Sequence, residues 1–219
     1  MTPNASDRTR VKRIPGRGSN DPETIASILD SVVICHVAFP FRGSVSVLPT
    51  GFVRIGDEIV IHGSAASAML RAIAEGCEVA IAVTNLEGLV LARSAFHHSM
   101  NYRSVVVFGK GRVVEGDEKL TALDCFLEKV VPGRSGNVRV PTDKELLATL
   151  VVAIPTTEAS AKERTGPPVD DDDDYSLPYW AGEVPVRTII GEPIADPKLD
   201  GSIPTPEHVT RLTTRKGFP

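Results

Sequence analysis

Two polar segments, each next to an apolar run, carry the side chains best suited to bind a charged small molecule. The first follows Ile59–Ile61 and reads His62-Gly63-Ser64-Ala65-Ala66-Ser67. The second precedes Val105–Gly109 and reads His97-His98-Ser99-Met100-Asn101-Tyr102-Arg103-Ser104. Polar groups beside a buried strand place fixed hydrogen-bond donors at the rim of a core, which is how small anionic ligands are held. The alternative is a polar loop entering a strand, and two such segments in one small domain favour ligand binding.

Composition limits the classes of protein to which the chain can belong. Its 219 residues and net charge of −4 suit a single domain, with extensions or paired with a second copy. No apolar run reaches the roughly 18 residues that cross a membrane, and the start of the chain lacks a secretory signal. The basic residues of Met1–Gly18 lie among Pro, Gly and Ser, so we expect a solvated arm and no nucleic-acid partner. Cys35, Cys77 and Cys125 show no metal-ligand spacing and predict a reducing, cytoplasmic location.

Local patterns predict helices near Asp21–Asp30, Ser64–Glu75 and Leu120–Val131. Asp21 is the expected cap of the first helix and Pro22 its first residue. The segment Asn85–Gly88 is predicted to be the turn between two strands. Apolar, β-branched runs predict strands at Val32–Phe39, Val45–Ile55, Ile59–Ile61, Glu78–Thr84, Leu89–Ala92, Ser104–Glu115, Leu150–Ile154 and Val184–Ile190.

Strands outnumber helices, and most connections between them are too short for parallel crossovers. The predicted fold is therefore mainly β: an antiparallel split β-barrel of about six strands with peripheral helices. Val79–Val83 and Val105–Phe108 are apolar on both faces. One small barrel does not bury both faces of its strands, so we expect a homodimer that pairs through the outward faces of these two segments.

The predicted organisation has four parts. Residues 1–18 form a flexible basic arm, and residues 19–158 form the barrel that binds the ligand. In residues 159–190, the acidic run Asp170–Asp174 is expected to be solvated rather than to bind calcium. The aromatic residues after this acidic run, which include Trp180, are expected to pack against the barrel. Residues 191–219 form an extended tail.

Several short segments occur in an order and at spacings that match a known family. They are Cys35-His36-Val37-Ala38-Phe39, Leu48-Pro49-Thr50-Gly51, His62-Gly63-Ser64 with Ser67, Leu89-Val90-Leu91-Ala92-Arg93-Ser94, His98-Ser99-Met100-Asn101-Tyr102-Arg103-Ser104-Val105, and Lys162-Glu163-Arg164-Thr165-Gly166-Pro167 leading to Trp180-Ala181-Gly182. The chain resembles the flavin-nucleotide-binding branch of the pyridoxamine 5'-phosphate oxidase-like split barrels, which also holds the nitroimidazole-resistance reductases. The resemblance implies a homodimer with FMN in clefts between the subunits. It assigns no reaction by itself.

An FMN site explains the residue types in both polar segments. A phosphate needs guanidinium, hydroxyl and backbone N–H donors, preferably at a helix N-terminus. His62, Gly63, Ser64 and Ser67 are the candidates at the start of the second predicted helix. Arg103 is the best candidate for the charge, with a surface salt bridge as the alternative. The remaining predicted contacts are His98, Ser99, Asn101, Tyr102, Ser104 and Trp180.

One departure from the resemblance affects the phosphate. Many relatives have Arg or Lys directly after the second Ser of this turn, where this chain has Ala68. Arg71, one turn further along, is the other guanidinium that can reach the phosphate. His36 and His62 are each more typical of a structural histidine, whereas His97 and His98 are better placed for ring contact or proton delivery. No carboxylate is positioned by the pattern to tune either of them, so the sequence identifies no catalytic residue.

Two classes of function remain. The first is an FMN-dependent oxidoreductase that passes electrons from NAD(P)H to a small organic acceptor, with the nicotinamide nucleotide bound only transiently because no Gly-rich fingerprint is present. The second is a non-catalytic flavin- or haem-binding protein for storage or sensing. Oxidation of pyridoxamine phosphate is a weaker third hypothesis, since no basic cluster is set apart for a second phosphate. The physiological substrate is not encoded in these patterns.

Overall fold

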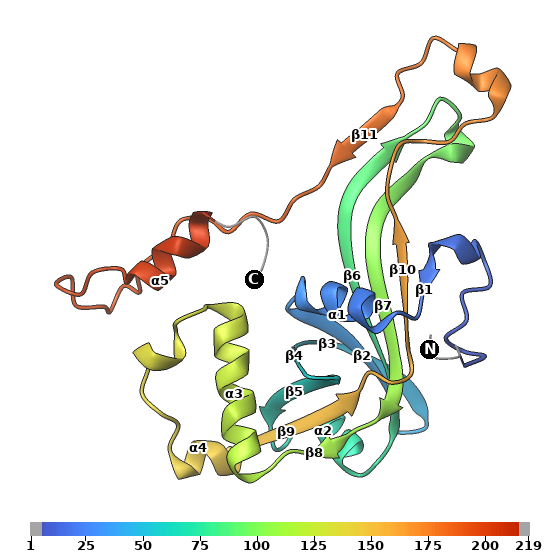
Figure 1. Cartoon of the computed structure of the whole chain (residues 1–219). Helices are drawn as coiled ribbons and strands as arrows, with labels where there is room; N and C mark the ends of the chain where they lie inside the picture. The colour runs from blue at the N-terminus through green and yellow to red at the C-terminus, as the bar shows by residue number, and fades with distance from the viewer. Residues whose placement is uncertain (1–5, 215–219) are drawn as a thin grey trace.

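The computed structural model describes residues 6–214 (Figure 1), so the ends of the predicted arm and tail, residues 1–5 and 215–219, lie outside the described residues. The helices are α1 (Pro22–Asp30), α2 (Ala68–Ala74), α3 (Gly116–Val130), α4 (Asp143–Ala148) and α5 (Glu207–Thr210). The strands are β1 (Gly18–Ser19), β2 (Ile34–Phe41), β3 (Ser44–Gly51), β4 (Val53–Ile55), β5 (Glu58–Ser64), β6 (Glu78–Leu91), β7 (Ser99–Lys110), β8 (Arg112–Val113), β9 (Thr149–Pro155), β10 (Ala159–Arg164) and β11 (Gly182–Pro185). None of the described helices is long and apolar enough to cross a membrane.

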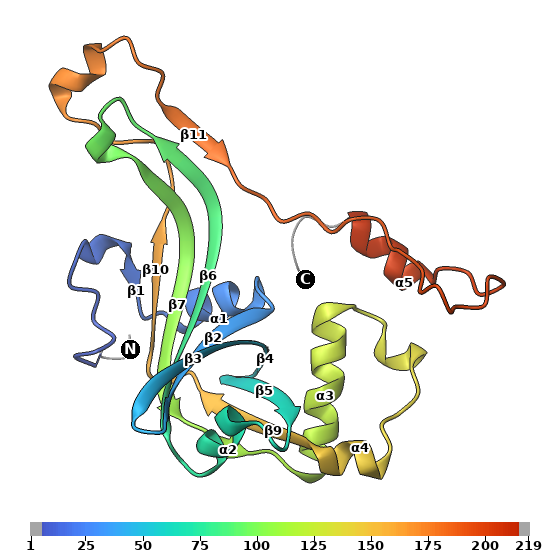
Figure 2. The ribbon, with the colours of Figure 1, turned by 180° about the vertical axis from the view of Figure 1, so that it is seen from behind.

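The strands form two sheets that close around one core, and this confirms the predicted split barrel. The larger sheet has the order β1-β10-β7-β6-β2-β3, with β11 added to the far half of β6, and the smaller has the order β4-β5-β9-β8. Every strand pair recorded within residues 6–214 is antiparallel. The upper halves of β6 and β7 extend beyond the barrel as a long hairpin, which β11 widens to three strands (Figures 1 and 2).

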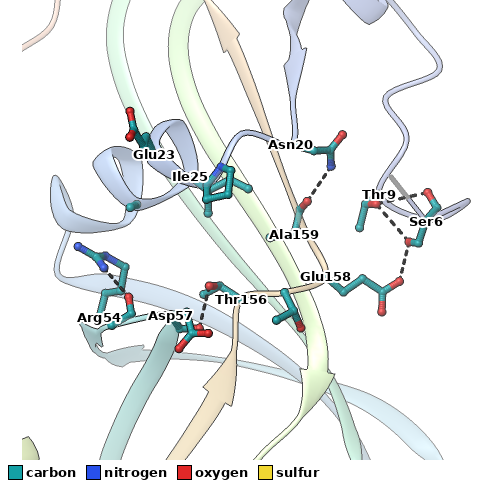
Figure 3. Close-up of a pocket in the computed structure, with 14 residues that line it drawn as sticks. Ser6, Thr9, Asn20, Glu23, Ile25, Arg54, Asp57, Thr156, Glu158 and Ala159 are labelled. Carbon is teal, nitrogen blue, oxygen red and sulfur yellow. Dashed lines mark hydrogen bonds between the residues drawn. The ribbon is translucent and has the colours of Figure 1, made fainter. Parts of the chain in front are cut away.

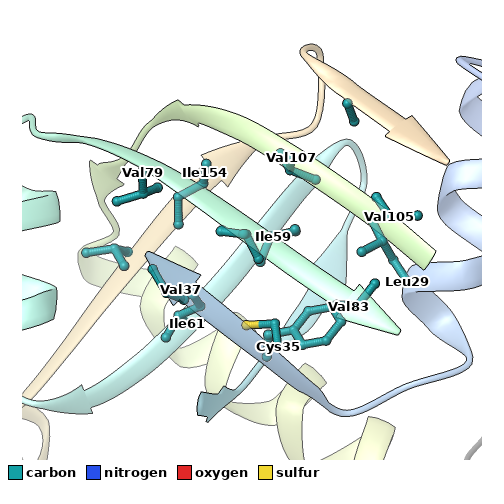
Figure 4. Packing of buried hydrophobic residues seen from close by; sticks show 14 of the residues in the cluster. Leu29, Cys35, Val37, Ile59, Ile61, Val79, Val83, Val105, Val107 and Ile154 are labelled. Atoms are coloured by element: carbon teal, nitrogen blue, oxygen red, sulfur yellow. The ribbon is translucent and has the colours of Figure 1, made fainter. Parts of the chain in front are cut away.

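The core lies between the two sheets, where β-branched side chains from both interdigitate (Figure 4). β6 contributes Val79, Ile81 and Val83, and β5 contributes Ile59 and Ile61. The alternate residues of β5 and β9, Val60, Val151 and Ala153 among them, form a second cluster with helix α3. Both faces of the smaller sheet are therefore buried within one chain, by the barrel on one side and by α3 on the other.

The two segments predicted to be apolar on both faces alternate in the structure. Val79, Ile81, Val83, Val105 and Val107 point into the core. Their outward neighbours, Ala80, Ala82, Val106 and Phe108, are half-buried. The Arg8 guanidinium lies 4.7 Å from the centre of the Phe108 ring and bonds to Glu78 and Glu158, so the described part of the N-terminal arm covers this end of the predicted interface.

Two predictions of local structure were wrong. Asn85–Gly88 is not a turn: β6 runs unbroken through it, with a register irregularity between Leu86 and Gly88. Gly88 allows β11 to pair closely with β6, because a Cβ at this position would lie only 3.3 Å from the Val184 carbonyl oxygen. Residues 159–164, for which no strand was predicted, form strand β10 between β1 and β7. Their pattern is polar at alternate positions, but Ala159 and Ala161 are buried.

Helix α1 begins and packs as its sequence predicts. The Asp21 carboxylate accepts hydrogen bonds from the Thr24 backbone N–H and hydroxyl, and Ile25, Ile28 and Leu29 are buried. Helix α2 begins later than predicted, because Ser67 is its cap and Ala68 its first residue. Ser64 instead ends strand β5.

The C-terminal end of α1 accepts a hydrogen bond from a half-buried lysine, Lys129. Lys129 Nζ donates to the Leu29 carbonyl oxygen at 2.9 Å and lies 4.2 Å from the centre of the Phe52 ring. Burial lowers the pKa of Lys129 from 10.5 to about 8. Between these two pH values the unfolded chain binds more protons than the folded chain, so the free energy of unfolding must rise with pH across this window.

We expect Lys129→Met to abolish that rise. Urea unfolding measured from below pH 8 to pH 10.5 should show increasing stability for the unmodified chain and a flatter profile for the variant. Lys144→Met is the control, since Lys144 is exposed. Equal pH slopes for the unmodified chain and Lys129→Met would mean that this amine titrates as if it were in water.

Candidate functional site

The predicted site residues form two groups on different elements of the chain (Figure 1). His62, Gly63, Ser64, Ser67 and Arg71 lie at the end of β5 and the start of α2, at the base of the barrel. The second group lies on the hairpin that projects from the barrel: His98, Ser99, Asn101, Tyr102, Arg103 and Ser104, on or next to the start of β7, with Trp180 just before β11. The structure of one chain does not bring the two groups together.

The turn between β5 and α2 is tightly folded and presents donors to solvent. Ser64 Oγ accepts from the Ala66 N–H at 3.1 Å, and Ser67 Oγ accepts from the Leu70 N–H at 3.4 Å. The exposed Arg71 side chain folds back over this turn, where its Nε donates to the Ala65 carbonyl oxygen at 2.8 Å. A guanidinium beside serine hydroxyls and the first N–H groups of a helix is a suitable arrangement for a phosphate.

His62 has a packing role in this chain. Its ring meets the Phe126 ring of α3 edge-on, with 4.5 Å between ring centres. Burial lowers the pKa of His62 below its ordinary value of 6.5, so the ring is neutral at neutral pH. It joins the candidate phosphate turn to helix α3.

Arg103, the predicted phosphate partner, is already paired. Its Nε donates to Glu87 Oε1 at 2.5 Å, across the β6–β7 ladder. Ser104 Oγ donates to the Lys162 carbonyl oxygen at 3.1 Å, which ties β7 to β10. His98 Nδ1 lies 3.0 Å from the Ser94 carbonyl oxygen. These three residues are thus engaged within the chain, whereas Arg71 is exposed and has no ion pair with another residue of the described range.

Asn101 belongs to a buried polar network that the sequence did not reveal. Its amide donates to Glu183 Oε2 at 2.5 Å and to the Gly166 carbonyl oxygen at 3.2 Å, and its oxygen accepts from Arg164 Nη1. Arg164 also donates to the carbonyl oxygens of Gly166 and Pro167. This network fastens the residue 164–167 turn and β11 to β7. Arg164 was recognised as part of a motif, but its partners are distant in sequence and gave no local signal.

A second set of contacts attaches the acidic run to the far end of the hairpin. Asp170, the first residue of the acidic run, has a fully buried side chain that accepts from the Arg93 and Ser94 N–H groups and from the Arg93 guanidinium. The exposed Asp171 carboxylate lies 3.3 Å from His97 Nε2. The acidic run is therefore attached through its first two residues rather than solvated throughout.

Trp180 is 69% exposed, although its ring packs against the backbone of Gly182. A Cβ at Gly182 would lie 3.0 Å from two atoms of the indole ring. The glycine therefore lets the indole lie flat along the strand, and its outer face remains free to contact another molecule.

Two larger cavities lie outside the predicted residues. One of about 520 Å³ lies between the N-terminal arm, α1 and the residues that join β9 to β10 (Figure 3). The other, of about 530 Å³, is lined by parts of β2 and β6 and by Val186 and Thr188 after β11. It includes His36, which the sequence favoured as structural. The motif that contains His36 was noted, but the pattern did not show that a cavity adjoins it.

Two antiparallel sheets around a shared core, with a polar turn before a short helix, define the class of split β-barrel proteins. A family model described as pyridoxamine 5'-phosphate oxidase matches residues 21–163. The chain belongs to this family. Among curated proteins, no sequence matches the chain.

Solved structures similar to this chain extend the comparison beyond residue 163. The flavocytochrome Anf3 from Azotobacter vinelandii is 38% identical, with a TM-score of 0.90 over 94% of this chain and 97% of that chain. The FAD and heme binding protein from Mycobacterium smegmatis is 39% identical, with a TM-score of 0.87 over 92% and 98% of the two chains. A putative 5-nitroimidazole antibiotic resistance protein from Bacteroides thetaiotaomicron, 21% identical with a TM-score of 0.55 over 65% and 83%, shares the fold.

Proposed function

We propose that this chain is a redox protein that binds a flavin and a haem and works as a homodimer. The observation that carries the proposal is its likeness to two proteins named for these cofactors. This likeness extends over 94% and 92% of the chain and includes the projecting hairpin and much of the C-terminal segment. Identities of 38% and 39% over such lengths support shared cofactors as well as a shared fold.

The flavin that we propose is FAD rather than the FMN expected from the sequence, because one of these relatives is named for FAD. Both nucleotides present a phosphate to the protein, so the turn of Ser64 and Ser67 with Arg71 suits either. The flavin supplies the electron-transfer chemistry when bound, while the chain provides phosphate donors and an apolar surround. Identification of the flavin released on denaturation decides between FAD and FMN.

The proposed homodimer follows from the separation of the two groups of site residues. In one chain the phosphate turn and the polar face of β7 are far apart, and β3 leaves its outer edge unpaired, with Val45 and Val47 exposed. A second copy can place its β7 group against the phosphate turn of the first and cover apolar surface at the same time. Light scattering should then report about twice the chain mass of 23.4 kDa, and a monomer would exclude a shared site.

The proposed reaction is transfer of electrons from NAD(P)H, through the flavin, to a small organic acceptor. The alternative, storage or sensing without turnover, is favoured by the engagement of His98 within the chain. Anaerobic mixing with NADH or NADPH separates the two. Bleaching of the flavin absorption within seconds supports the enzyme, and no reduction over an hour supports the binding protein. The three cysteines are free thiols, in keeping with the reducing cytoplasm that we propose as the location.

We expect Arg71→Ala to weaken binding of FAD or FMN by about 1.5–3 kcal/mol, the range for a hydrogen bond to a charged group. Riboflavin binding should change little, because riboflavin has no phosphate. Titration of apoprotein with each flavin, followed by fluorescence quenching, measures both effects. Arg103→Ala is the comparison, and it should lose less because Glu87 already shares its charge. If Arg103→Ala instead lost more affinity for FAD and FMN than Arg71→Ala, with riboflavin binding unchanged, the phosphate would be assigned to the site residues on β7.

A further inference from the structure

The cavity of about 530 Å³ on the outer face of the larger sheet has apolar walls and one metal-binding side chain. Val32, Val33, Ile34, Leu86 and Val186 supply the walls. Ile34 is 49% exposed and Leu86 38% exposed, which leaves apolar surface available to a ligand. The volume falls in the range of cavities that bind cofactors in proteins.

His36 lines this cavity from strand β2. Alternation along β2 buries Cys35, Val37 and Phe39 in the core and leaves the His36 ring on the outer face. Its cross-strand neighbours are Pro49 on β3 and Ala82 on β6. Both of these side chains are short, and the cavity of about 530 Å³ lies beside the imidazole.

The His36 ring has no hydrogen bond or ion pair to any residue in the described range 6–214. The other histidines are placed differently. His97 and His98 each have one ring nitrogen engaged, His62 packs on Phe126, and the half-buried His208 lies against the loop at Gly133. His36 thus combines an unengaged ring with an apolar cavity.

The polar residues that line the cavity also suit a haem. Thr84, Asn85 and Thr188 offer hydroxyl and amide groups, and such groups can bond to carboxylates like the propionates of haem. The carboxylate of Glu87, which would oppose them, is paired with Arg103. A cavity lined by both apolar and polar side chains matches the amphipathic form of this cofactor.

We propose that the His36 imidazole would bind the iron of a haem held in the cavity between β2, β6 and residues 186–188. A neutral imidazole nitrogen is the ligand that haem iron most often takes from proteins. The inference rests on the proposed function, because it supplies the residue for a cofactor that this function requires.

The test uses the full chain reconstituted with haemin, with the Soret band, the ferric electron paramagnetic resonance spectrum and the haem-to-protein ratio as readouts. His36→Ala should lose haem affinity at least tenfold, the lower end of the range that loss of even a supporting partner costs. Added imidazole should restore a spectrum like that of the unmodified chain. His36→Met, which keeps a possible ligand, should retain haem with an altered spectrum. Flavin content should not change in any of these variants.

His208→Ala removes an imidazole that lies outside this cavity; it is the matched control and should leave both spectra unchanged. If the unmodified chain binds flavin but no haem, the haem part of the proposed function fails. If it binds haem and the two His36 variants give unchanged spectra and affinity, the proposed function stands and the assignment of His36 is overturned. Loss of haem in His208→Ala alone would overturn it too. A lower flavin content with normal haem in His36→Ala would assign the cavity to the flavin instead.

Discussion

Asp170→Asn is expected to loosen the acidic run from the hairpin and to lower the local free energy of opening. The substitution keeps an oxygen that accepts hydrogen bonds but removes the charge that pairs with the Arg93 guanidinium. Burial opposes the charged form of Asp170, but bonds from the Arg93 and Ser94 N–H groups and from the Arg93 guanidinium outweigh burial and lower the pKa of Asp170. The carboxylate therefore contributes stability at neutral pH, and this is lost as the pH falls through the lowered pKa.

Amide hydrogen exchange at Arg93 and Ser94 measures this effect directly, because both amides donate to the Asp170 carboxylate. Asp173→Asn makes the same chemical change at an exposed position of the same run and should leave exchange unaltered. Equal exchange rates in the two variants would mean that the run is held by its backbone and aromatic contacts rather than by this carboxylate.

Arg164→Met is expected to cost at least about 1 kcal/mol of global stability. The substitution keeps an apolar stem and removes the donors to Asn101 Oδ1 and to the Gly166 and Pro167 carbonyl oxygens. Asn101 Oδ1, which is buried, would then lack its donor, and an unsatisfied buried acceptor costs about 1–3 kcal/mol. Urea unfolding gives the stability, and hydrogen exchange along β11 reports whether that strand loosens first.

Arg13→Met is the control for Arg164→Met, since Arg13 is exposed. If the network also positions Asn101 for the flavin, Arg164→Met should retain less flavin after purification, whereas Arg13→Met should retain the normal amount. Full stability and full flavin content in Arg164→Met would show that water replaces the lost donors.

The fold was largely predictable because the barrel strands and α1 carry strong local patterns. Asp21, Pro22 and the apolar spacing of Ile25, Ile28 and Leu29 identify α1 without any tertiary information. β10 was missed because its stability comes from pairing with β1 and β7, so a segment with Lys162, Glu163 and Arg164 looked solvated. The same tertiary pairing carries β6 through a segment that resembles a turn.

The candidate site was less predictable than the fold. Types and spacing selected the serine turn and Arg71, whose contacts are only a few residues apart in sequence. They could not show that Arg103 pairs with Glu87 or that Asp170 is buried against Arg93, because those partners come from other strands. His36 was undervalued for a similar reason: the cavity beside it exists only once β6 and residues 186–188 flank β2.

The position of β9 and β10 within the sheets has a consequence for synthesis of the protein on the ribosome. β9 separates β5 from β8, and β10 separates β1 from β7, so both sheets stay incomplete until residues 149–164 have been made. Until then the nascent chain exposes open edges of β5 and β7, together with the core valines behind them. Pairing of β1 with β10 joins residues 18–19 to residues 161–162, and such distant contacts form slowly. Chaperone protection during translation should therefore matter most in the interval just before β9 and β10 emerge.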